Sequence, residues 1–342
     1  MTTVGIIANP ASGKDIRRLV AYGSVFDNRE KINIVRRVLT GLNALGVERV
    51  LYMPEYFGIV PQAVQGLRLD LAVEPLCMQA LNSDRDSLNA ASLMRQSGVG
   101  CIVTLGGDGT NRVVAKACGQ VPLTAISTGT NNVFPGLVEG TVAGMAAALV
   151  ARGLVEPEIS IKRRPRLDLR REEDGKRDIA LIDAAVHESF FTASRAIWDP
   201  SRLSRLAVAW VSPTGIGLSS LAGYCWPQSP GPPDGGALLL ELGEGGASIL
   251  APLAPGLVVQ VPVRGVQILG PGEEVVFARH SCVIALDGER EVEVGGGDVW
   301  MLSFNPDGPR VVDIGAAVQE AARRGILGRV DKLFKNTNLG GE

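Results

Sequence analysis

The sequence is poor in the residues that build metal clusters and disulfide frameworks. Its 342 residues include two histidines and five cysteines, and the cysteines are widely spaced, odd in number and form no C-x-x-C pair. We therefore expect neither kind of site, and a reducing cytoplasm is the expected setting. The N-terminus also lacks the basic and apolar regions of a signal peptide, and no uncharged apolar run reaches membrane-spanning length. Neither export nor a membrane span is expected.

The chain also carries little net charge. Its 34 lysines and arginines nearly balance 36 aspartates and glutamates, for a formal charge of -2. A large positive excess is typical of general binders of nucleic acid or anionic membranes, so neither is expected as a partner. We interpret the basic run at residues 162–177 as a solvated strand edge that discourages strand pairing. With 46% hydrophobic residues, the chain is long and apolar enough for two domains.

The most informative stretch is a glycine-rich turn between two apolar segments. Residues 101–105 are an apolar run, residues 106–110 read Gly-Gly-Asp-Gly-Thr, and apolar residues then recur in a pattern compatible with a helix. This order predicts a strand, a tight loop and a helix start. The glycines are expected to allow φ > 0 and a close approach of ligand. Amides at a helix N-terminus favour an anion such as phosphate.

Two more polar loops that contain glycine follow apolar runs. They are residues 9–14, Asn-Pro-Ala-Ser-Gly-Lys, and residues 127–132, Ser-Thr-Gly-Thr-Asn-Asn. Open α/β sheets bind ligands at the carboxyl ends of their strands, so we expect the three loops to converge. The residues predicted to hold a nucleotide there are Asn9, Ser12, Lys14, Gly106, Gly107, Gly109, Thr110, Thr128, Gly129, Asn131 and Asn132.

Asp108 is the acidic residue within these loops. A carboxylate repels phosphate, so next to a phosphate it would accept a proton from a hydroxyl or hold a metal ion. The alternative is an ordinary turn in which aspartate makes a local hydrogen bond. Phosphate-cradling loops with one carboxylate, and no nucleophilic Cys/His or Ser/His pairing, favour phosphoryl transfer over hydrolysis. We therefore predict Asp108 as the catalytic base.

The pattern of strands and helices changes partway along the chain. Residues 1–153 alternate between strand and helix patterns, which predicts a doubly wound, mostly parallel α/β sheet that binds nucleotide phosphates. Residues 154–313 contain many short alternating runs separated by turns, including Asp174-Gly175, and predict an antiparallel β-sandwich that binds the substrate. Residues 314–342 predict a C-terminal helix that packs back on the first domain.

Three motifs resemble the ATP-NAD kinase family, a relative of the diacylglycerol and sphingosine kinases. They are the Gly-Gly-Asp-Gly-Thr loop, the Asn-Pro-x-Ser-Gly-Lys opening and Ser-Pro-Thr-Gly at residues 212–215. The longer stretches at 106–112, 127–135 and 212–219 are similar to the family's acetoin catabolism X branch. The resemblance implies the fold above, ATP and Mg²⁺ as cofactors, Asp108 as base, a nucleotide and a small molecule as binding partners, and a homo-oligomer. No protein metal ligand is predicted.

The chain departs from the family pattern on the acceptor side. NAD kinases carry an Asn-Glu pair that binds nucleoside ribose, and this chain has Ile182-Asp183 there. Their later loop continues with polar residues and a tyrosine, whereas residues 216–219 read Ile-Gly-Leu-Ser. A site that loses an amide and an aromatic contact should discriminate base and ribose less well. The substrate-binding residues expected from the resemblance are Asp183, Thr214, Gly215 and Ser219.

Three acidic residues carry further structural expectations. Asp168 and Asp183 are expected on the arms of one hairpin. Asp287-Gly288 resembles a late Asp-Gly turn of the family, but we interpret it as a plain hairpin turn.

Three functions remain open from the sequence. The leading one is a kinase that transfers the γ-phosphoryl group of ATP to NAD, forming NADP. The second is a kinase that acts on another small alcohol or a lipid-like alcohol. The third is a nucleotide-binding sensor without useful turnover.

Overall fold

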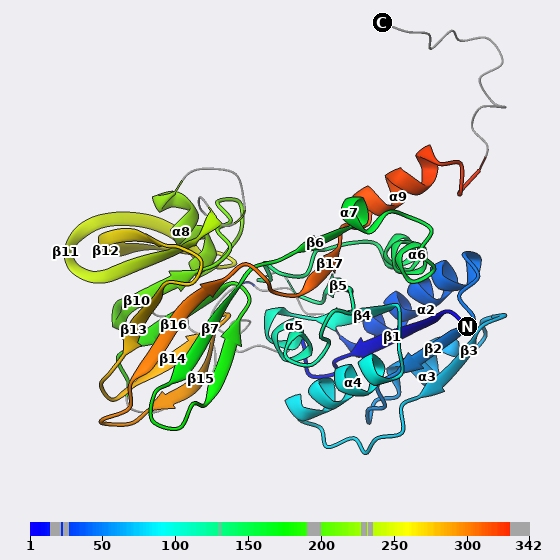
Figure 1. Ribbon diagram of the computed structural model, residues 1–342, viewed down its shortest axis with the longest axis horizontal. Helices are drawn as coiled ribbons and strands as arrows, with labels where there is room; N and C mark the ends of the chain where they lie inside the picture. Colours follow the sequence, from blue (N-terminus) through cyan, green and yellow to red (C-terminus); the bar gives the residue numbers. More distant parts are fainter. Residues whose placement is uncertain are drawn as a thin grey trace, which may run out of the picture.

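The computed structural model describes residues 1–13, 22, 27–129, 131–189, 200–226, 231 and 235–328, apart from the side chains of 290 and 291. They form an α/β part and a mainly β part, joined by two connecting segments of the chain (Figure 1). Lys14 and Thr130 lie outside the described residues. Among the described residues, no helix is both long and apolar enough to cross a membrane.

The α/β part is built on a seven-stranded sheet with the order β3-β2-β1-β4-β5-β17-β6. Every neighbouring pair is parallel except β17 and β6. This confirms the predicted mostly parallel sheet. The strands are β1 (Thr3–Ala8), β2 (Arg49–Tyr52), β3 (Ala72–Pro75), β4 (Cys101–Gly106), β5 (Leu123–Ser127), β6 (Ile161–Arg163) and β17 (Arg310–Val312).

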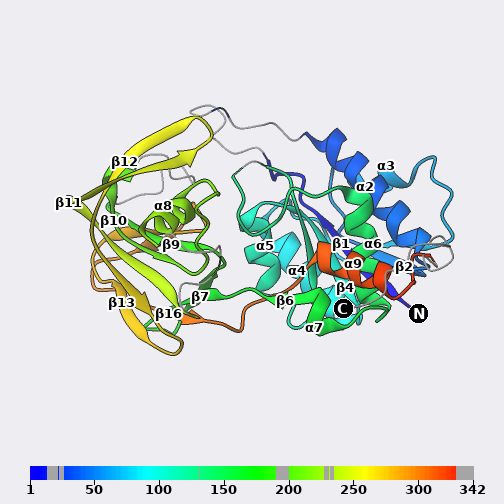
Figure 2. The same ribbon diagram turned by 90° about the horizontal axis from the view of Figure 1, so that it is seen from above.

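Helices cover both faces of this sheet (Figures 1 and 2). Ile6 of β1 belongs to one apolar cluster and its neighbour Ile7 to another, because successive strand residues point to opposite faces. The first cluster includes residues of α2 (Asn28–Ala44), α3 (Ile59–Val64), α6 (Gly140–Ala151) and α9 (Ile314–Arg323), and the second includes residues of α4 (Asp84–Gln96) and α5 (Asp108–Ala115). The fold is therefore doubly wound.

Local sequence signals account for where several helices begin. The Asp27 side chain accepts a hydrogen bond from the Glu30 amide at the start of α2. Ser83 and Asp86 form a capping box at the start of α4. Helices α2 and α6 can pack closely because Gly144 has no side chain. A Cβ at this position would lie 2.3 Å from the Val38 carbonyl oxygen.

The mainly β part contains two antiparallel sheets that pack face to face. A six-stranded sheet has the order β12-β11-β10-β9-β14-β15, and a four-stranded sheet has the order β13-β16-β7-β8. Apolar side chains from both sheets form the cluster between them, and α8 (Leu218–Cys225) packs on the other face of the larger sheet. The strands are β7 (Arg166–Arg171), β8 (Arg177–Ala180), β9 (Asp183–His187), β10 (Leu203–Val208), β11 (Ala237–Ala254), β12 (Leu257–Leu269), β13 (Glu274–Ala278), β14 (Cys282–Leu286), β15 (Glu289–Val294) and β16 (Trp300–Asn305).

Two strands that come after residue 153 in the chain belong to the seven-stranded sheet. β6 and β17 pair within the seven-stranded sheet, although both lie inside the range 154–313 that the sequence assigns to the β domain. Pro165, which has no N–H to donate, separates β6 from β7. A Cβ at Gly308 would lie 2.0 Å from the Arg164 carbonyl oxygen, so the outgoing and returning segments touch there. The boundaries at 153 and 313 stay predictions.

The C-terminal helix follows the returning strand. Asp313 caps α9 by accepting a hydrogen bond from the Ala316 amide, and Ala317 and Ala321 of α9 join the same apolar cluster as α6. The short helix α7 (Pro157–Ser160) lies beside it (Figure 1).

Candidate functional site

Three loops meet at the carboxyl edge of the seven-stranded sheet. They follow β1, β4 and β5, which are neighbouring parallel strands. The Asn9 Nδ2 donates to Thr110 Oγ1 at 2.9 Å, and the Ser12 and Thr128 hydroxyls are 2.9 Å apart. The Thr128 amide donates to the Gly106 carbonyl at 3.3 Å. Side chains from all three predicted loops are therefore hydrogen bonded to one another.

Asp108 is the first residue of α5 and faces the loop after β5. Only 8% of the residue is exposed. The Phe134 amide donates to Oδ1 at 2.8 Å, and the Val133 amide lies 3.1 Å from both carboxylate oxygens. The backbone amide of Asp108 donates to Asn132 Oδ1 at 3.3 Å. The carboxylate is thus held in one orientation at the meeting point of the loops.

The predicted reason for the three glycines is wrong in part. Gly106, Gly107 and Gly109 all have negative φ, so none is needed for left-handed backbone. Close packing explains two of them instead, because a Cβ at Gly106 would lie 2.5 Å from Thr110 Cβ and one at Gly107 would lie 2.8 Å from Asn132 Oδ1. A Cβ at Gly109 would be in ordinary contact with Glu289, at 3.5 Å.

Some polar side chains of the loop after β5 are hydrogen bonded within the loop, and one polar atom has no hydrogen-bond partner in the described part of the chain. Asn132 donates to the Ser127 hydroxyl at 2.8 Å and accepts from the Asp108 amide, so it fixes the loop. The Ser127 hydroxyl donates to the Gly129 carbonyl at 2.7 Å. The Oδ1 of Asn131, by contrast, is buried without a hydrogen-bond partner among the described residues. A buried acceptor of this kind costs free energy unless a ligand or water satisfies it.

A lysine that sequence reasoning missed supports the loop after β1. Lys31 lies on α2 and is fully buried. Its Nζ donates to the carbonyls of Asn9 at 2.8 Å, Pro10 at 3.3 Å and Ser12 at 2.7 Å. The predicted lysine of this loop, Lys14, lies outside the described residues. No local motif distinguishes Lys31 from a solvated helical lysine.

An arginine from the junction between the two parts reaches the same place. The Arg164 guanidinium lies 3.4 Å from the Trp210 ring centroid and 5.7 Å from that of Phe134, and it donates to the Val133 carbonyl at 3.3 Å. Burial lowers the pKa of Arg164 to about 10, and the negative charge of Asp108 opposes that shift. Arg164 therefore stays cationic at neutral pH and partly offsets the charge of Asp108.

The Asp287 turn is more than a plain hairpin turn. Its side chain is fully buried and accepts from the amides of Leu181, Ile182 and Asp183 at 2.8 to 3.3 Å. Burial raises the pKa of Asp287, and the charge of Arg112 together with the three amides opposes the rise. The backbone of Asp287 has a φ of 51°, a left-handed conformation that residues other than glycine rarely adopt. The turn thus anchors the start of β9 beside α5.

A small cavity of about 30 Å³ lies between the two parts, beside Asp108. Its polar lining comes from Asn131 and three aspartates, and the remaining walls are mainly apolar. The lining residues are Asp108, Asn131, Val133, Asp183, Ile216, Gly217, Leu218, Leu253, Asp287 and Gly288. Asp183, predicted on the acceptor side, is therefore brought to the same cavity as Asp108.

The other acceptor-side residues lie differently. Thr214 is exposed, Gly215 closes a turn by donating from its amide to the Ser212 carbonyl at 2.9 Å, and neither lines the cavity. The Ser219 hydroxyl is buried and donates to the Trp210 carbonyl at 2.6 Å, so it fixes the start of α8. The apolar residues of the loop, Ile216 and Leu218, face the cavity instead. Contact of Thr214, Gly215 and Ser219 with a substrate stays a prediction.

The expected placement of Asp168 and Asp183 on one hairpin is wrong. Asp168 lies on β7 of the four-stranded sheet, where it pairs with Arg166 at 2.6 Å. Asp183 begins β9 of the six-stranded sheet. The chain passes from one sheet to the other between Ala180 and Asp183. The amides of this connection donate hydrogen bonds to the Asp287 carboxylate instead of to a neighbouring strand.

The described residues hold no group of three or more His, Cys, Asp and Glu side chains arranged to bind a metal ion. Magnesium that accompanies a nucleotide needs only one or two protein carboxylates, because phosphates and water complete its coordination. Asp108 and Asp183, which both line the cavity, fit that smaller requirement.

Comparisons with known proteins assign a family model to each part. Residues 4–154 match the ATP-NAD kinase N-terminal domain, and residues 165–307 match the acetoin catabolism protein X C-terminal domain. Acetoin catabolism protein X of Cupriavidus necator is 40% identical over 337 residues, which cover 95% of this chain and 93% of that protein. A crystal structure of yeast NADH kinase complexed with NADH is similar at 14% identity with a TM-score of 0.48, covering 100% of this chain and 90% of that chain.

Proposed function

Because the chain belongs to the acetoin catabolism protein X family and its first domain is an ATP-NAD kinase domain, we propose that it is an ATP-dependent kinase with a hydroxyl group as phosphoryl acceptor. The observation that carries this proposal is the position of Asp108. Its carboxylate is oriented by two backbone amides at the junction of three polar loops, and it opens on the cavity between the domains.

The residues divide the reaction between them. The first amides of α5 have no partner within the helix, and with the polar side chains of the loops they bind the nucleotide phosphates. Asp108 accepts the proton of the acceptor hydroxyl as that oxygen attacks the γ-phosphorus, and ADP leaves. Arg164 offsets negative charge near Asp108. Bound Mg²⁺ would neutralise phosphate charge, held by Asp108 or Asp183.

The acceptor that the geometry supports best is a small alcohol. Ile216 and Leu218 line the cavity beside Asp108, where NAD kinases are expected to present polar and aromatic groups. The name of the Cupriavidus necator relative concerns acetoin catabolism, which involves a small hydroxyl compound. We therefore rank a small hydroxylated molecule above a dinucleotide as acceptor.

NAD is the second candidate acceptor. It is supported by the match of residues 4–154 to the ATP-NAD kinase N-terminal domain and by Asp183, an acid placed where it could accept a hydrogen bond from a ribose hydroxyl. Binding of either acceptor would require the cavity beside Asp108 to open, because its volume of about 30 Å³ holds only water-sized groups.

One assay distinguishes the candidates. Purified protein is incubated with ATP and Mg²⁺ together with NAD, acetoin, butanediol or diacylglycerol, and ADP release is followed. ADP release with acetoin or butanediol supports the small-alcohol kinase, and NADP formation supports the NAD kinase. Nucleotide binding without ADP release from any acceptor would contradict the kinase proposal and favour a sensor.

The role of Asp108 is tested by substitution once an acceptor is found. D108N removes the proton acceptor but keeps the size of the side chain, so we expect turnover to fall by at least about 100-fold. The matched control is D168N, because Asp168 pairs with Arg166 and lies outside the cavity. If D108N retains turnover within about tenfold of the wild type, the assignment of the base fails.

A further inference from the structure

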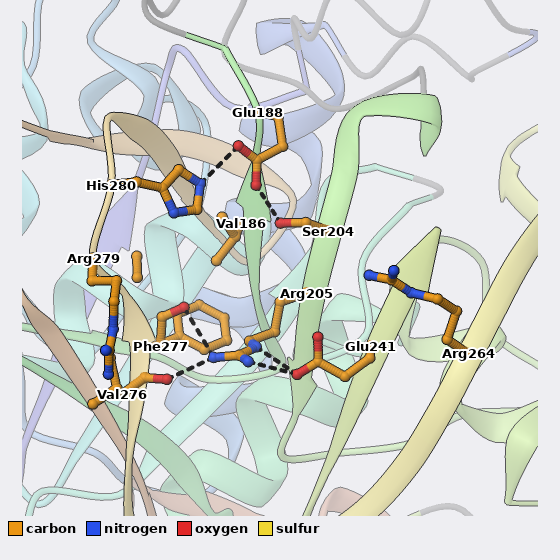
Figure 3. Close-up of a pocket in the computed structure, with 11 residues that line it drawn as sticks. Val186, Glu188, Ser204, Arg205, Glu241, Arg264, Val276, Phe277, Arg279 and His280 are labelled. Carbon is orange, nitrogen blue, oxygen red and sulfur yellow. Dashed lines mark hydrogen bonds and ion pairs between the residues drawn. The ribbon is translucent and has the colours of Figure 1, made fainter. Parts of the chain in front are cut away.

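A second and larger cavity opens in the β domain. Its volume is about 340 Å³, and it lies between strands β9 to β12 of the six-stranded sheet and β13 of the four-stranded sheet (Figure 3). It shares no lining residue with the cavity beside Asp108. Its volume is at the lower end of the range for pockets that bind small organic molecules.

Irregular strand pairing surrounds this cavity. The register of β10 with β9 shifts between Leu203 and Arg205, and that of β13 with β16 shifts between Val276 and Ala278. Strand β11 shifts against β12 between Leu242 and Ala247. Such bulges redirect side chains and are common beside functional sites. Here Arg205 and Val276, each at a register shift, line the cavity.

Arg205 lines the cavity, and its guanidinium is bound to other groups of the protein. Its Nε and Nη2 lie 2.8 and 2.7 Å from Glu241 Oε1, and its Nη1 donates to the Val276 carbonyl at 2.6 Å (Figure 3). These bonds connect β10 to β13 across the two sheets. Because its charge is paired with Glu241, Arg205 contributes shape and rigidity rather than free charge.

Two other arginines bring unpaired positive charge to the cavity. Arg264 and Arg279 line it from opposite sides, and neither forms a hydrogen bond or ion pair with any other described residue (Figure 3). Arg264 is seated over the backbone at Gly243, where a Cβ would lie 3.2 Å from its Cζ and where φ is 136°. The bulge in β11 therefore provides the space in which this guanidinium sits.

The remaining wall carries hydrogen-bonding groups. Glu188 accepts from the Ser204 hydroxyl at 2.5 Å, and its other oxygen lies 2.8 Å from His280 Nε2 (Figure 3). Three arginines against two glutamates leave the cavity with a positive excess. The cavity thus combines two unpaired guanidinium groups with a cluster that can bind hydroxyl groups.

From this arrangement we propose that the cavity binds a small hydroxylated organic anion. Arg264 and Arg279, on opposite sides of the cavity, supply the positive charge that attracts its phosphate or carboxylate group, and the planar guanidinium matches the oxygen geometry of both groups. Glu188, Ser204 and His280 bind its hydroxyl groups. This site is separate from the proposed kinase site, and its ligand need not be a substrate of the kinase.

Three matched probes test the proposal by isothermal titration calorimetry at constant ionic strength. They are glycerol 3-phosphate, glycerate and uncharged glycerol. We expect one or both anions to bind with a stoichiometry of one and to raise the melting temperature, and glycerol to show no binding. The relative affinity of the two anions shows whether the cavity prefers phosphate or carboxylate. The proposal is wrong if neither anion binds at a probe concentration of about 10 mM, which is high enough to detect weak binding.

Variants distinguish this cavity from the phosphate-binding loops. We expect R264Q and R279Q each to weaken anion binding at least about tenfold, because each removes a charged hydrogen-bond donor. Neither arginine has a partner to lose among the described residues, so both variants should fold, which the melting temperature checks. The control R170Q removes an exposed arginine that pairs with Glu274 outside the cavity, and it should bind like the wild type.

The variant D108N separates this proposal from the kinase proposal. We expect D108N to bind the anions with unchanged affinity, because Asp108 does not line this cavity. Binding that is lost in D108N but retained in R264Q and R279Q would place the probe at the kinase site and overturn the inference.

Discussion

The Nε of Arg112 lies 3.5 Å from Oδ2 of Asp287, and both side chains are almost completely buried. Arg112 belongs to α5, the helix that Asp108 begins, and Asp287 belongs to the turn between β14 and β15. The same arginine also lies 3.3 Å from Asp178 at the end of the four-stranded sheet. One guanidinium therefore connects the helix of the candidate catalytic residue to both sheets of the β domain.

Removal of this arginine should destabilise the protein strongly. R112M leaves the buried Asp287 carboxylate without its cationic partner, and we expect the free energy of unfolding to fall by about 3 to 5 kcal/mol. Urea denaturation measures the change. R37M is the control, because Arg37 forms exposed ion pairs with Glu30 and Glu139, and its loss should cost no more than about 1 kcal/mol. Equal effects of the two substitutions would contradict the structural role of Arg112.

The cost of R112M should depend on pH. Burial raises the pKa of Asp287 in the folded state, so the folded chain binds more protons than the unfolded chain between the two pKa values. The free energy of unfolding therefore falls as the pH rises through that interval. Because Arg112 opposes the rise, its removal raises the folded pKa further and widens the interval. We expect R112M to lose more stability at pH 8 than at pH 5, and an equal loss at both would refute this explanation.

Two glycines of the central loop should respond differently to alanine. In G106A the new methyl group would lie 2.5 Å from Thr110 Cβ and would displace the residue that accepts from Asn9. We expect nucleotide affinity to fall at least tenfold, which corresponds to about 1.4 kcal/mol. In G109A the methyl group makes an ordinary contact with Glu289, at 3.5 Å, and we expect less than a threefold change, about 0.6 kcal/mol. Nucleotide titration of both variants checks the contrast.

Lys31 should support both stability and nucleotide binding. K31M leaves three carbonyl oxygens of the loop after β1 without their charged donor, and we expect a loss of at least about 2 kcal/mol in the free energy of unfolding. Nucleotide affinity should fall with it, since the loop loses its support. K162M removes an exposed lysine paired with Asp313 and should change both quantities little. Wild-type stability in K31M would show that the loop is held by other contacts.

Arg164 and its sequence neighbour provide another matched pair. R164M removes the cation that stacks on Trp210 and faces the charge of Asp108, and we expect a loss of about 2 kcal/mol together with reduced turnover. R163M removes an arginine whose ion pair with Asp307 is exposed, and it should lose less than about 1 kcal/mol. Thermal denaturation and the ADP-release assay measure both effects. A smaller loss in R164M than in R163M would contradict the stacking interpretation.

The sequence alone determined the features that depend on neighbours along the chain. The alternation of apolar runs with helical patterns predicts the parallel sheet, and the three polar loops converge because β1, β4 and β5 end at one edge. The repeated turns after residue 154 likewise predict antiparallel sheets. These predictions succeed because hydrogen-bond periodicity and turn chemistry act over a few residues.

Only the tertiary structure decided which distant groups meet. Lys31 and Arg164 carry no local signal, and the motifs that contain Arg112 and Asp287 do not show that these two side chains pair, since burial and partner choice depend on segments far apart in sequence. The same reason explains the wrong placement of Asp168 with Asp183 and the unexpected return of β17 to the first sheet. The role of these charged side chains depends on how far folding buries them and on which opposite charges or hydrogen-bonding groups it places beside them. Both are set by the tertiary structure.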